Sequence, residues 1–562
     1  MESLLDAAHA WLEEDPDPET REELRGLIEQ CSDADGGDGA TNGAANSATA
    51  DDARAELADR FNGTLQFGTA GLRGTLGAGP NRMNRVVVIR AAAGLARYLQ
   101  DTGHVDDAVV IGYDARKNSD VFARDTAEVM TGVGLSAMVL PHPLPTPVLA
   151  FAIRELGACA GVMVTASHNP PRDNGYKVYL GDGSQITPPA DAEIAARIDA
   201  VGRLSEIPRG DEWQTLDHSV VEAYLERAIR VLDPNGPRTL KVVSTALHGV
   251  GGTVLTAAFE RAGFAAPVPV PEQQDPDPAF RTVAFPNPEE PGAIDLALAL
   301  AEKTGADLVI ANDPDADRCA AAAPIGPDGA WRMLRGDEVG ALLGSYLAER
   351  GRVSADDVFA TTIVSSSLLG KIAAAHGIAY RETLTGFKWL SKIPDLAFGY
   401  EEALGYCVDP GGVRDKDGIT AGLLVAELAA ALKAAGSDLG ADLERIAARY
   451  GRHTTDQLSV RVNDLAAIPR MMASLRATPP EQLGVFAVTR IDDLEQGADG
   501  LPPTDGLRLA LEGGARVVIR PSGTEPKLKC YLEVVTDGSA QQAAQLLAGI
   551  KVDLQARFDA SE

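Results

Sequence analysis

Hydrophobic and polar positions alternate along most of the chain, as short apolar runs followed by longer, alanine-rich stretches with helical spacing. Short β-branched runs that end in Gly, Ser or Asp are typical of buried strands. Strands that alternate with helices predict α/β units, in which ligand chemistry lies at the carboxyl ends of the strands. The expected elements are a strand at 86–89, a helix at 91–100, a strand at 109–113, a helix at 122–132, and strands at 240–245, 307–311 and 358–364.

The last hundred or so residues follow a different pattern. Apolar runs at 505–511, 516–520 and 528–534 are separated by turn residues and are followed by a closing helical stretch. Runs so closely spaced are typical of strands joined by hairpins. The sequence therefore predicts a smaller α+β domain at the carboxyl end, and it shows no short-period repeat of the solenoid kind.

The first sixty residues contain two helical stretches and a segment of low complexity. Apolar residues recur at helical spacing within residues 4–30. Residues 32–53 consist almost entirely of Asp, Gly, Ala, Ser, Thr and Asn. Burial of so few large apolar groups does not offset the chain entropy that is lost on folding. This acidic insert is therefore predicted to be disordered.

Length and composition limit the possible function classes. A chain of 562 residues predicts three or four domains, and 45% apolar residues are ordinary for a globular protein. No stretch approaches the roughly 18 apolar residues of a membrane helix, and the amino end resembles no targeting signal, so we expect a soluble, cytoplasmic protein. The net charge of −30 repels nucleic acid and anionic membranes, neither of which is expected as a partner. Five scattered cysteines without CxxC spacing suggest neither a disulfide framework nor a zinc site.

The first candidate site is a serine loop after an apolar strand. Ser167 and His168 lie in Thr-Ala-Ser-His-Asn-Pro-Pro, and Lys177 follows an Asn-Gly turn. A serine at such a strand end is a candidate nucleophile. The segment does not match the GxSxG pattern of hydrolases, and a histidine next to the serine in sequence is a poor triad base. The alternative is a turn stabilised by serine and asparagine side chains.

The second candidate is an acidic turn after another apolar strand. Asp313, Asp315 and Asp317 occupy alternate positions, and three such carboxylates can bind one hard cation and leave sites for water and phosphate oxygen. Arg318 stands where a calcium loop of the EF-hand type requires glycine. Asp317 stands where the aspartyl phosphatases of the haloacid dehalogenase type carry Thr or Val. The alternative is a solvated acidic turn without an ion.

The third candidate is a loop between two predicted strands near the carboxyl end. Small residues with exposed backbone N–H groups, flanked by arginine and lysine, are typical of a phosphate-binding site. The alternative is a hairpin turn in which the basic residues have no such role. The residues concerned are Arg520, Ser522, Gly523, Thr524 and Lys527.

The fourth candidate contains two adjacent carboxylates in Gly-Tyr-Glu-Glu-Ala-Leu-Gly-Tyr. Glu401 and Glu402 can accept hydrogen bonds from neighbouring sugar hydroxyls, and Lys388 in Thr-Gly-Phe-Lys can contact a phosphate. A solvated helix start explains the two acids about as well. The Gly-rich segments 68–74 and 246–252 match neither GxGxxG nor the P-loop and are interpreted as turns.

Together, and in this order, the four loops resemble the α-D-phosphohexomutase superfamily. The segments FGTAGLRG, TGFKW and GYEEALGY are similar to its phosphoglucomutase/phosphopentomutase branch, and the resemblance covers residues 61 to about 560. It implies an α/β fold of three similar mixed α/β domains and a C-terminal α+β domain around a central cleft. The implied domains are a helical leader (1–60), a phosphoserine domain (61–210), a metal-binding domain (211–325), a sugar-binding domain (326–455) and a phosphate-binding domain (456–562).

The resemblance also implies a role for each loop. Ser167 would be the phosphoserine, and Mg²⁺ would be held by an oxygen of that group and by Asp313, Asp315 and Asp317. Lys177 would act in proton transfer, with His168, Arg318 and Arg73 in support. The sugar hydroxyls would be bound by Glu401 and Glu402, and the phosphate that is not transferred by Lys388, Arg520, Ser522, Gly523, Thr524 and Lys527.

The implied activity is interconversion of glucose 1-phosphate and glucose 6-phosphate through a phosphoserine, with a sugar 1,6-bisphosphate as intermediate and activator. Glucose-specific relatives carry Gly-Glu-Glu-Ser where this chain has Tyr-Glu-Glu followed by Ala403, so two other activities stay open. These are a phosphopentomutase for ribose or deoxyribose phosphates and a glucose 1,6-bisphosphate synthase. From a different class, a non-catalytic phosphosugar-binding protein is the alternative. The sequence does not indicate the oligomeric state.

Overall fold

The computed structural model describes residues 2–32, 43–326, 329–462, 464, 466–522 and 527–559. The chain divides into two compact units. The first contains residues 1–234, 241–319 and 411–423, and the second contains 235–240, 320–410 and 424–562. Each unit is described by itself.

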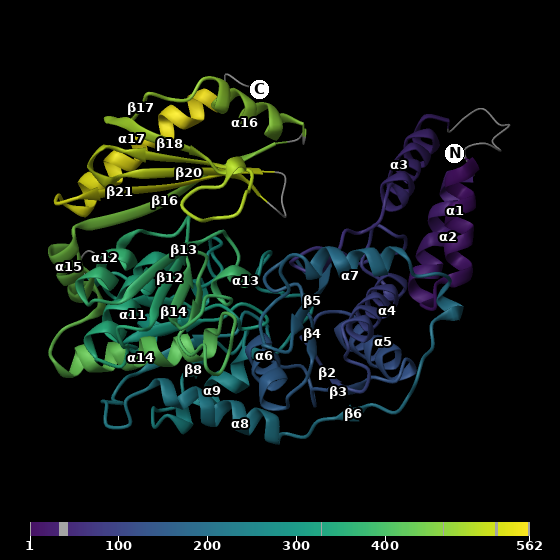
Figure 1. Cartoon of the computed structure of the whole chain (residues 1–562), viewed down its shortest axis with the longest axis horizontal. Coiled ribbons are helices and arrows are strands. Elements are labelled where there is room, and N and C mark those ends of the chain that lie inside the picture. Colours follow the sequence, from purple (N-terminus) through teal and green to yellow (C-terminus); the bar gives the residue numbers. More distant parts are fainter. Residues whose placement is uncertain are drawn as a thin grey trace. The chain divides into compact units, whose positions relative to one another are not determined.

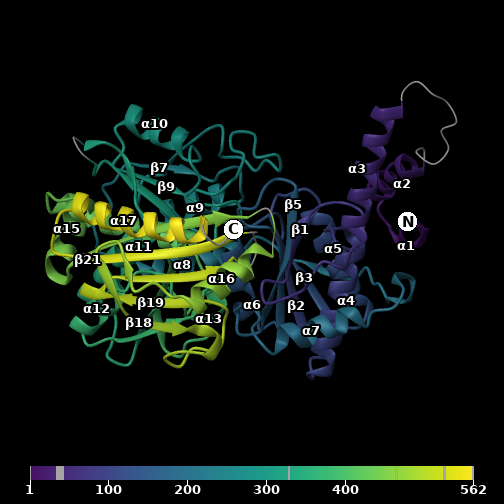
Figure 2. The ribbon, with the colours of Figure 1, turned by 90° about the horizontal axis from the view of Figure 1, so that it is seen from above.

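Three helices open the first unit: α1 (Glu2–Glu14), α2 (Pro18–Ser32) and α3 (Gly43–Phe61). Figure 2 shows them side by side, and Trp11, Leu24 and Leu57 are buried among them. Residues 43–53, which the sequence predicted to be disordered, form the first part of α3, because alanine favours the helix and Ala53 adds to this core. Residues 33–42 of the predicted insert lie outside the described residues.

A mixed sheet with the strand order β1-β5-β4-β2-β3-β6 follows. β2 is parallel to β3 and β4, whereas β5 is antiparallel to both β4 and β1. Helices α4 and α5 cover one face and α6 covers the other (Figure 1). In chain order the elements are β1 (Leu72–Thr75), α4 (Arg85–Asp101), β2 (Ala108–Tyr113), α5 (Ser119–Gly132), β3 (Ser136–Val139), α6 (Thr146–Glu155), β4 (Ala160–Val164), β5 (Asp173–Leu180), α7 (Ala190–Asp199), the 3-10 turn η1 (Leu204–Glu206) and β6 (Gln214–Thr215).

The prediction of a strand at 86–89 is wrong, because these residues form the first turn of α4. The side chain of Asn84 accepts a hydrogen bond from the backbone N–H of Val87 and so caps the helix. Val86 and Val88 are fully buried in the helix, so burial overrides the strand preference of β-branched residues.

A second set of α/β elements completes the first unit, with β7 parallel to β8 and β9. These elements are α8 (Ser219–Ala228), the 3-10 turn η2 (Ile229–Val231), β7 (Val242–Thr245), α9 (Gly251–Arg261), β8 (Val268–Pro269), α10 (Asp295–Thr304) and β9 (Leu308–Ala311). Both β4 and β9 consist of buried residues and end at a candidate loop.

The second unit contains another mixed sheet, with the strand order β13-β12-β14-β15. β12 is parallel to β13 and β14, and β14 forms an antiparallel pair with β15. The elements are β10 (Ala320–Ala323), β11 (Arg332–Met333), α11 (Gly336–Glu349), β12 (Val358–Thr362), α12 (Leu368–Ala375), β13 (Ala379–Thr383), α13 (Phe387–Leu390), β14 (Leu396–Glu401), β15 (Gly405–Cys407), α14 (Gly418–Ala434), whose first turns belong to the first unit, and α15 (Leu439–Tyr450).

The carboxyl end forms an antiparallel sheet with the order β16-β21-β20-β19-β18-β17, covered on one face by α16 and α17 (Figure 1). The predicted fold class, with α/β units and a C-terminal α+β domain, is confirmed. The elements are β16 (Arg452–Arg461), α16 (Ala467–Ala477), β17 (Gln482–Leu483), β18 (Phe486–Asp493), η4 (Leu494–Gln496), β19 (Leu507–Leu511), η5 (Glu512–Gly514), β20 (Arg516–Pro521), β21 (Lys527–Thr536) and α17 (Ala540–Asp559).

Within the described ranges, no single helix combines the length and apolar character needed to cross a membrane. The pair α14 and α15, bent by 91°, meets that test only when its two helices are taken together. All five cysteines are buried and free of disulfides, as the sequence predicted.

Candidate active site

The serine loop begins where the buried strand β4 ends. Ser167 is 3% exposed and has a φ of +51°, a left-handed conformation that is uncommon for a residue with a side chain. Its backbone N–H donates to Thr165 Oγ1 at 2.9 Å. Such strained backbone persists only where its surroundings fix it, and it clusters at functional sites.

Arg116 holds the backbone of the serine loop in place. It is 4% exposed, and its guanidinium donates to four carbonyl oxygens of the loop: those of Ser167 and Asn169 at 2.6 Å, Pro170 at 2.8 Å and Asp173 at 3.1 Å. Only the planar fork of arginine presents so many donors in fixed directions. Arg116 was not predicted as a site residue, although its Asp-Ala-Arg segment follows the end of β2 as the candidate loops follow their strands.

The three aspartates lie in the turn after β9 and are brought to the serine. All are at most 1% exposed, and Ala316 between them has a φ of +53°, which folds the turn back on itself. One oxygen of each carboxylate lies within 4.8 Å of the others. The Ser167 hydroxyl donates to Asp313 Oδ2 at 2.7 Å, so two loops 146 residues apart in the sequence meet at this bond.

Buried cations surround this acidic turn. Lys177, on β5, donates to Asp315 Oδ2 at 2.7 Å and to Asp317 Oδ2 at 3.0 Å. Lys416 Nζ lies 3.2 Å from Asp317 Oδ2, and the Thr146 hydroxyl donates to Asp315 Oδ2 at 2.7 Å. Neither Thr146 nor Lys416 was predicted to lie here, since only the tertiary fold brings them to the turn.

The electrostatics of the turn explain why it suits a cation. Burial, together with the charges of Asp315 and Asp317, raises the pKa of Asp313 well above its ordinary value. Burial also acts to raise the pKa of Asp315, but the charge of Lys177 outweighs it and the pKa lies below its ordinary value. Burial and Asp315 act to raise the pKa of Asp317, and Lys177 and Lys416 bring it below the ordinary range. Three carboxylates this close therefore do not all ionise freely on their own.

Two carboxylate oxygens are left without a hydrogen bond. Asp315 Oδ1 and Asp317 Oδ1 are buried and find no hydrogen-bond partner in the part of the chain that is described. Buried unpaired carboxylate oxygens are costly, and each such atom in a folded protein calls for an explanation. A hard divalent cation bound by the three carboxylates would satisfy both oxygens, so the residues present fit such an ion.

The predicted supporting residues also lie in this site. His168 Nδ1 is 3.3 Å from Ser167 Oγ, and burial, with Arg318 and Arg73 nearby, lowers its pKa well below the ordinary value, so the ring is neutral. The backbone N–H of Arg318 donates to Asp313 Oδ1 at 3.0 Å. Arg73 donates to Asn169 Oδ1 at 3.2 Å.

The Gly-rich segments that the sequence analysis interpreted as turns also position the site loops. A Cβ on Gly249 would lie 2.2 Å from the Pro314 backbone in the acidic turn. A Cβ on Gly71, which has a φ of +73°, would lie 1.8 Å from the Tyr176 carbonyl oxygen, next to Lys177. Both glycines therefore allow close backbone approach to the site.

The second unit holds the other predicted groups. Glu401, at the end of β14, accepts a hydrogen bond at 2.9 Å from the N–H of Gly386, the N-cap residue of α13, and Lys388 lies in that helix. Glu402 accepts one from the Ser365 hydroxyl at 2.8 Å. Burial, with the charge of Glu401, raises the pKa of Glu402 to about 7. The interpretation of these acids as a solvated helix start is wrong, because Glu401 ends β14 and Glu402 lies in the turn that leads to β15.

This raised pKa predicts how stability depends on pH. Between the ordinary value of 4.5 and about 7, the folded protein holds a proton on Glu402 that the unfolded chain has lost. Stability therefore falls as pH rises through this window. We expect Glu402→Gln to have a higher melting temperature than wild type at pH 8, with little difference at pH 4.5. The exposed Glu512→Gln serves as the control, and equal melting curves at pH 8 would contradict the shift.

The predicted phosphate loop follows β20. Arg520 is paired with Lys529 across β20 and β21, and the Ser522 N–H donates to the Lys527 carbonyl oxygen at 2.9 Å. Gly523 and Thr524 lie outside the described residues. Burial raises the pKa of Tyr531, nearby Glu402 adds to the rise, and a hydrogen bond with Arg520 opposes it. Tyr531 therefore lies beside both the acidic loop and the base of the phosphate loop.

Four family models match consecutive parts of the chain. "Phosphoglucomutase/phosphomannomutase, alpha/beta/alpha domain I" matches residues 64–204, domain II of the same description matches 222–326 and domain III matches 335–450. The "C-terminal domain" of this family matches residues 458–550.

Relatives of the whole chain carry several related names. A "probable phosphomannomutase" of Haemophilus influenzae is 48% identical over 80% of this chain and 93% of its own length. A human phosphopentomutase is 36% identical over 87% of this chain and 88% of its own length. A human glucose 1,6-bisphosphate synthase is 34% identical over 96% of this chain and 91% of its own length. The solved structure of the Paramecium phosphoglucomutase pp63/parafusin, in its open form, is 18% identical in sequence. It matches 90% of this chain and 96% of its own length with a TM-score of 0.70, so the fold is similar.

Proposed function

The chain belongs to the phosphoglucomutase/phosphomannomutase family, and from this premise we propose that it interconverts glucose 1-phosphate and glucose 6-phosphate with Mg²⁺ and a phosphoserine. That it is an enzyme, a mutase of the phosphotransferase kind, follows from the family. The glucose phosphates, the metal and the roles of the individual residues are the proposal.

One observation carries the proposal: the Ser167 hydroxyl lies 2.7 Å from Asp313, which belongs to a buried trio of aspartates, and Lys177 bridges the other two. A protein that only binds a phosphosugar needs no buried serine next to a cation site. Asp313, Asp315 and Asp317 would hold Mg²⁺, which when bound neutralises negative charge on the phosphoryl group during transfer.

The chain's own residues account for the rest of the first half-reaction. The bond between Ser167 Oγ and phosphorus breaks while a sugar hydroxyl oxygen bonds to the same phosphorus, which leaves a sugar bisphosphate. Burial acts to lower the pKa of Lys177, but Asp315 and Asp317 raise it above its ordinary value. Lys177 therefore stays protonated beside Asp315 and Asp317, and we assign it the donation of a proton to Oγ. Neutral His168, 3.3 Å from Oγ, can accept a proton.

The second half-reaction is the reverse from the other end of the sugar. The bisphosphate turns around, its other phosphoryl group is transferred to Ser167, and the isomeric monophosphate leaves. We assign the phosphate that is not transferred to Arg520, Ser522, Lys527 and the loop between them, and the sugar hydroxyls to Glu401. Glu401, Arg520, Ser522 and Lys527 all belong to the second unit.

Arg116 is a positioning residue in this scheme. Lysine at this position keeps the charge but not the planar fork, so it holds fewer of the loop carbonyls. We expect Arg116→Lys to lower kcat by on the order of 10²-fold, since small misplacements of a reacting group have such effects, with little change in KM. Arg124→Lys, an exposed substitution on α5, is the control. A kcat equal to that of wild type would show that the clamp does not position Ser167.

A pentose phosphate is the second candidate substrate. The human phosphopentomutase is similar along most of the chain, and Ala403 lacks the hydroxyl that glucose-specific relatives carry. We propose to compare kcat/KM for glucose 1-phosphate, mannose 1-phosphate and ribose 1-phosphate, each with Mg²⁺ and a trace of the matching bisphosphate. The proposal predicts the highest value for glucose. A higher value for ribose or mannose would transfer the assignment to that sugar.

Two further alternatives give different outcomes in the same experiment. A glucose 1,6-bisphosphate synthase would accumulate bisphosphate from a separate phosphoryl donor and turn over the monophosphates slowly. A non-catalytic phosphosugar-binding protein would bind these compounds, convert none of them and show no phosphorylated fraction in its intact mass.

A further inference from the structure

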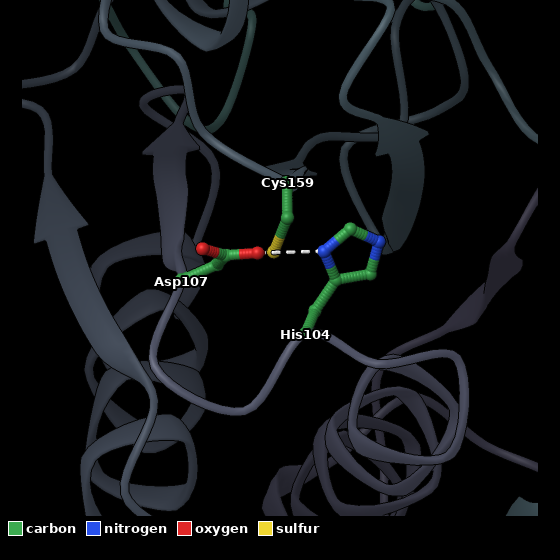
Figure 3. A group of neighbouring side chains, drawn as sticks. All are labelled: His104, Asp107 and Cys159. Carbon is green, nitrogen blue, oxygen red and sulfur yellow. Dashed lines mark hydrogen bonds and ion pairs between the residues drawn. The ribbon is translucent and has the colours of Figure 1, made fainter.

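A second group of side chains of the types that bind metals lies in the first unit, away from the aspartate trio. His104 and Asp107 belong to the loop between α4 and β2, and Cys159 directly precedes β4. Figure 3 shows the imidazole, the carboxylate and the thiol converging on one point. One donor atom from each lies within 4.8 Å of the others.

The backbone holds all three residues in place. The His104 N–H donates to the Leu99 carbonyl oxygen at 2.9 Å, where the chain leaves α4. The Asp107 carbonyl oxygen accepts from Ser136 at 3.1 Å, and the Cys159 N–H donates to the Ala108 carbonyl oxygen at 2.9 Å. The cluster is therefore built at the amino ends of β2 and β4, two neighbouring strands inside the sheet, although its loop is at the surface.

The side chains differ in exposure in a way that suits a site open to solvent. His104 Nδ1 and Asp107 Oδ2 are 2.7 Å apart, and their side chains are 42% and 54% exposed. The Cys159 thiol is buried at 9% exposure and makes a weak hydrogen bond to the Ala108 carbonyl oxygen at 3.3 Å. All three line a cavity of about 370 Å³ beside Tyr98 and Leu180.

We propose that His104, Asp107 and Cys159 bind a borderline-soft divalent transition-metal ion, Zn²⁺ above all. Nitrogen, carboxylate oxygen and thiolate sulfur together are a donor set that Zn²⁺ accepts and that Mg²⁺ does not favour. Three protein ligands leave a fourth tetrahedral position, and the cavity has room there for water. The ion ties the α4–β2 loop to the start of β4.

Binding exchanges a proton for the metal. Burial, with the charge of Asp107, raises the pKa of Cys159 to about 11, so the thiol is protonated without metal. On binding, the S–H bond breaks, the S–metal bond forms and the proton leaves to solvent. His104 binds through Nδ1 in its neutral form, and the separation of Nδ1 and Oδ2 widens as the ion enters between them.

The site differs from the Mg²⁺ site in place and in chemistry. Cys159 precedes β4 and Ser167 follows it, so the two sites lie at opposite ends of one strand. The spacing of the cysteines gave no sign of zinc, because the other two ligands come from a loop more than fifty residues earlier. Only the pairing of β2 with β4 brings Ala108 beside Cys159.

Cobalt(II) distinguishes this site from the aspartates. The full-length protein is saturated with Mg²⁺, titrated with Co²⁺, and followed by near-ultraviolet absorption, where only a thiolate-bound cobalt gives a charge-transfer band. We expect this band to rise to one equivalent in wild type and to be removed by Zn²⁺. Cys159→Ser should abolish it. His104→Ala and Asp107→Asn should weaken cobalt binding by at least about tenfold, since even groups that only support ligands have effects of this size.

Matched controls make the result decisive. Cys31→Ser removes another buried thiol of the same unit and should leave the band unchanged. His104 is partly exposed and Asp107 is exposed, so their variants should fold even if the cysteine variant does not. Absence of a thiolate band in wild type, or a band that persists in either exposed variant with unchanged affinity, would overturn the proposal. Mutase turnover in Mg²⁺ should be the same in His104→Ala as in wild type, so failure here leaves the proposed function untouched.

Discussion

Ser167→Ala is expected to lower kcat by about 10⁴-fold or more, with substrate binding largely kept. Removing a nucleophile that forms a covalent intermediate has effects of this order or larger, because no other group replaces it. The substitution also removes the hydrogen bond to Asp313, for which the loss of stability should be about 1 kcal/mol. The measurement is kcat for glucose 1-phosphate with saturating Mg²⁺ and bisphosphate.

Ser184 provides a matched control for this experiment. It is a fully buried serine in the turn that follows β5, and its hydroxyl donates to Asp182 at 2.8 Å. Ser184→Ala should retain turnover with a similar change in stability. If Ser167→Ala retained turnover within tenfold of wild type, the phosphoserine assignment would be wrong.

Lys177→Met is expected to affect both stability and activity strongly. It leaves Asp315 and Asp317 buried without their shared cation, and breaking a buried ion pair on one side costs about 3–5 kcal/mol. If Lys177 is the proposed proton donor, its loss should lower kcat by on the order of 10²–10⁴-fold. The loss in melting temperature should be larger in EDTA than in Mg²⁺, because a cation bound by the aspartates replaces the missing charge.

The exposed Lys303→Met, on α10, is the control for the change of side chain. A melting-temperature loss that is the same in EDTA and in Mg²⁺ would show that no cation binds at the aspartates. A normal kcat in Lys177→Met would remove Lys177 from proton transfer and leave it the role of anchoring the two carboxylates.

Those residues of the candidate site that directly follow buried strands could be predicted from the sequence. Ser167 follows β4 and the aspartates follow β9, both recognisable as buried apolar runs, and the turn residues after them mark the loops. The carboxyl ends of parallel strands tend to lie at one edge of a sheet, which makes such positions predictable. The meeting of the serine with Asp313 could be inferred only from the resemblance to a family, since the two loops belong to different sheets.

The sequence could not predict features that depend on packing between distant segments. Arg116 and Lys416 carry no motif, and their roles arise only because β2 and residues 411–423 fold onto the site loops. The segment 86–89 looks like a strand because its residues are β-branched, but a cap at Asn84 and burial on α4 decide for helix. Alanine-rich residues 43–53 look disordered by composition, yet α3 packs its second half against α1 and α2.

The most direct test of the central claim is to locate the phosphoryl group and follow its transfer. The protein is incubated with glucose 1,6-bisphosphate and Mg²⁺, digested, and the phosphorylated peptide is identified by mass spectrometry before and after a chase with glucose 1-phosphate or glucose 6-phosphate. The account predicts a single phosphoryl group on Ser167, which either monophosphate removes as bisphosphate forms. Turnover with an unmodified Ser167, or a phosphoryl group on another residue that the chase discharges, would contradict it.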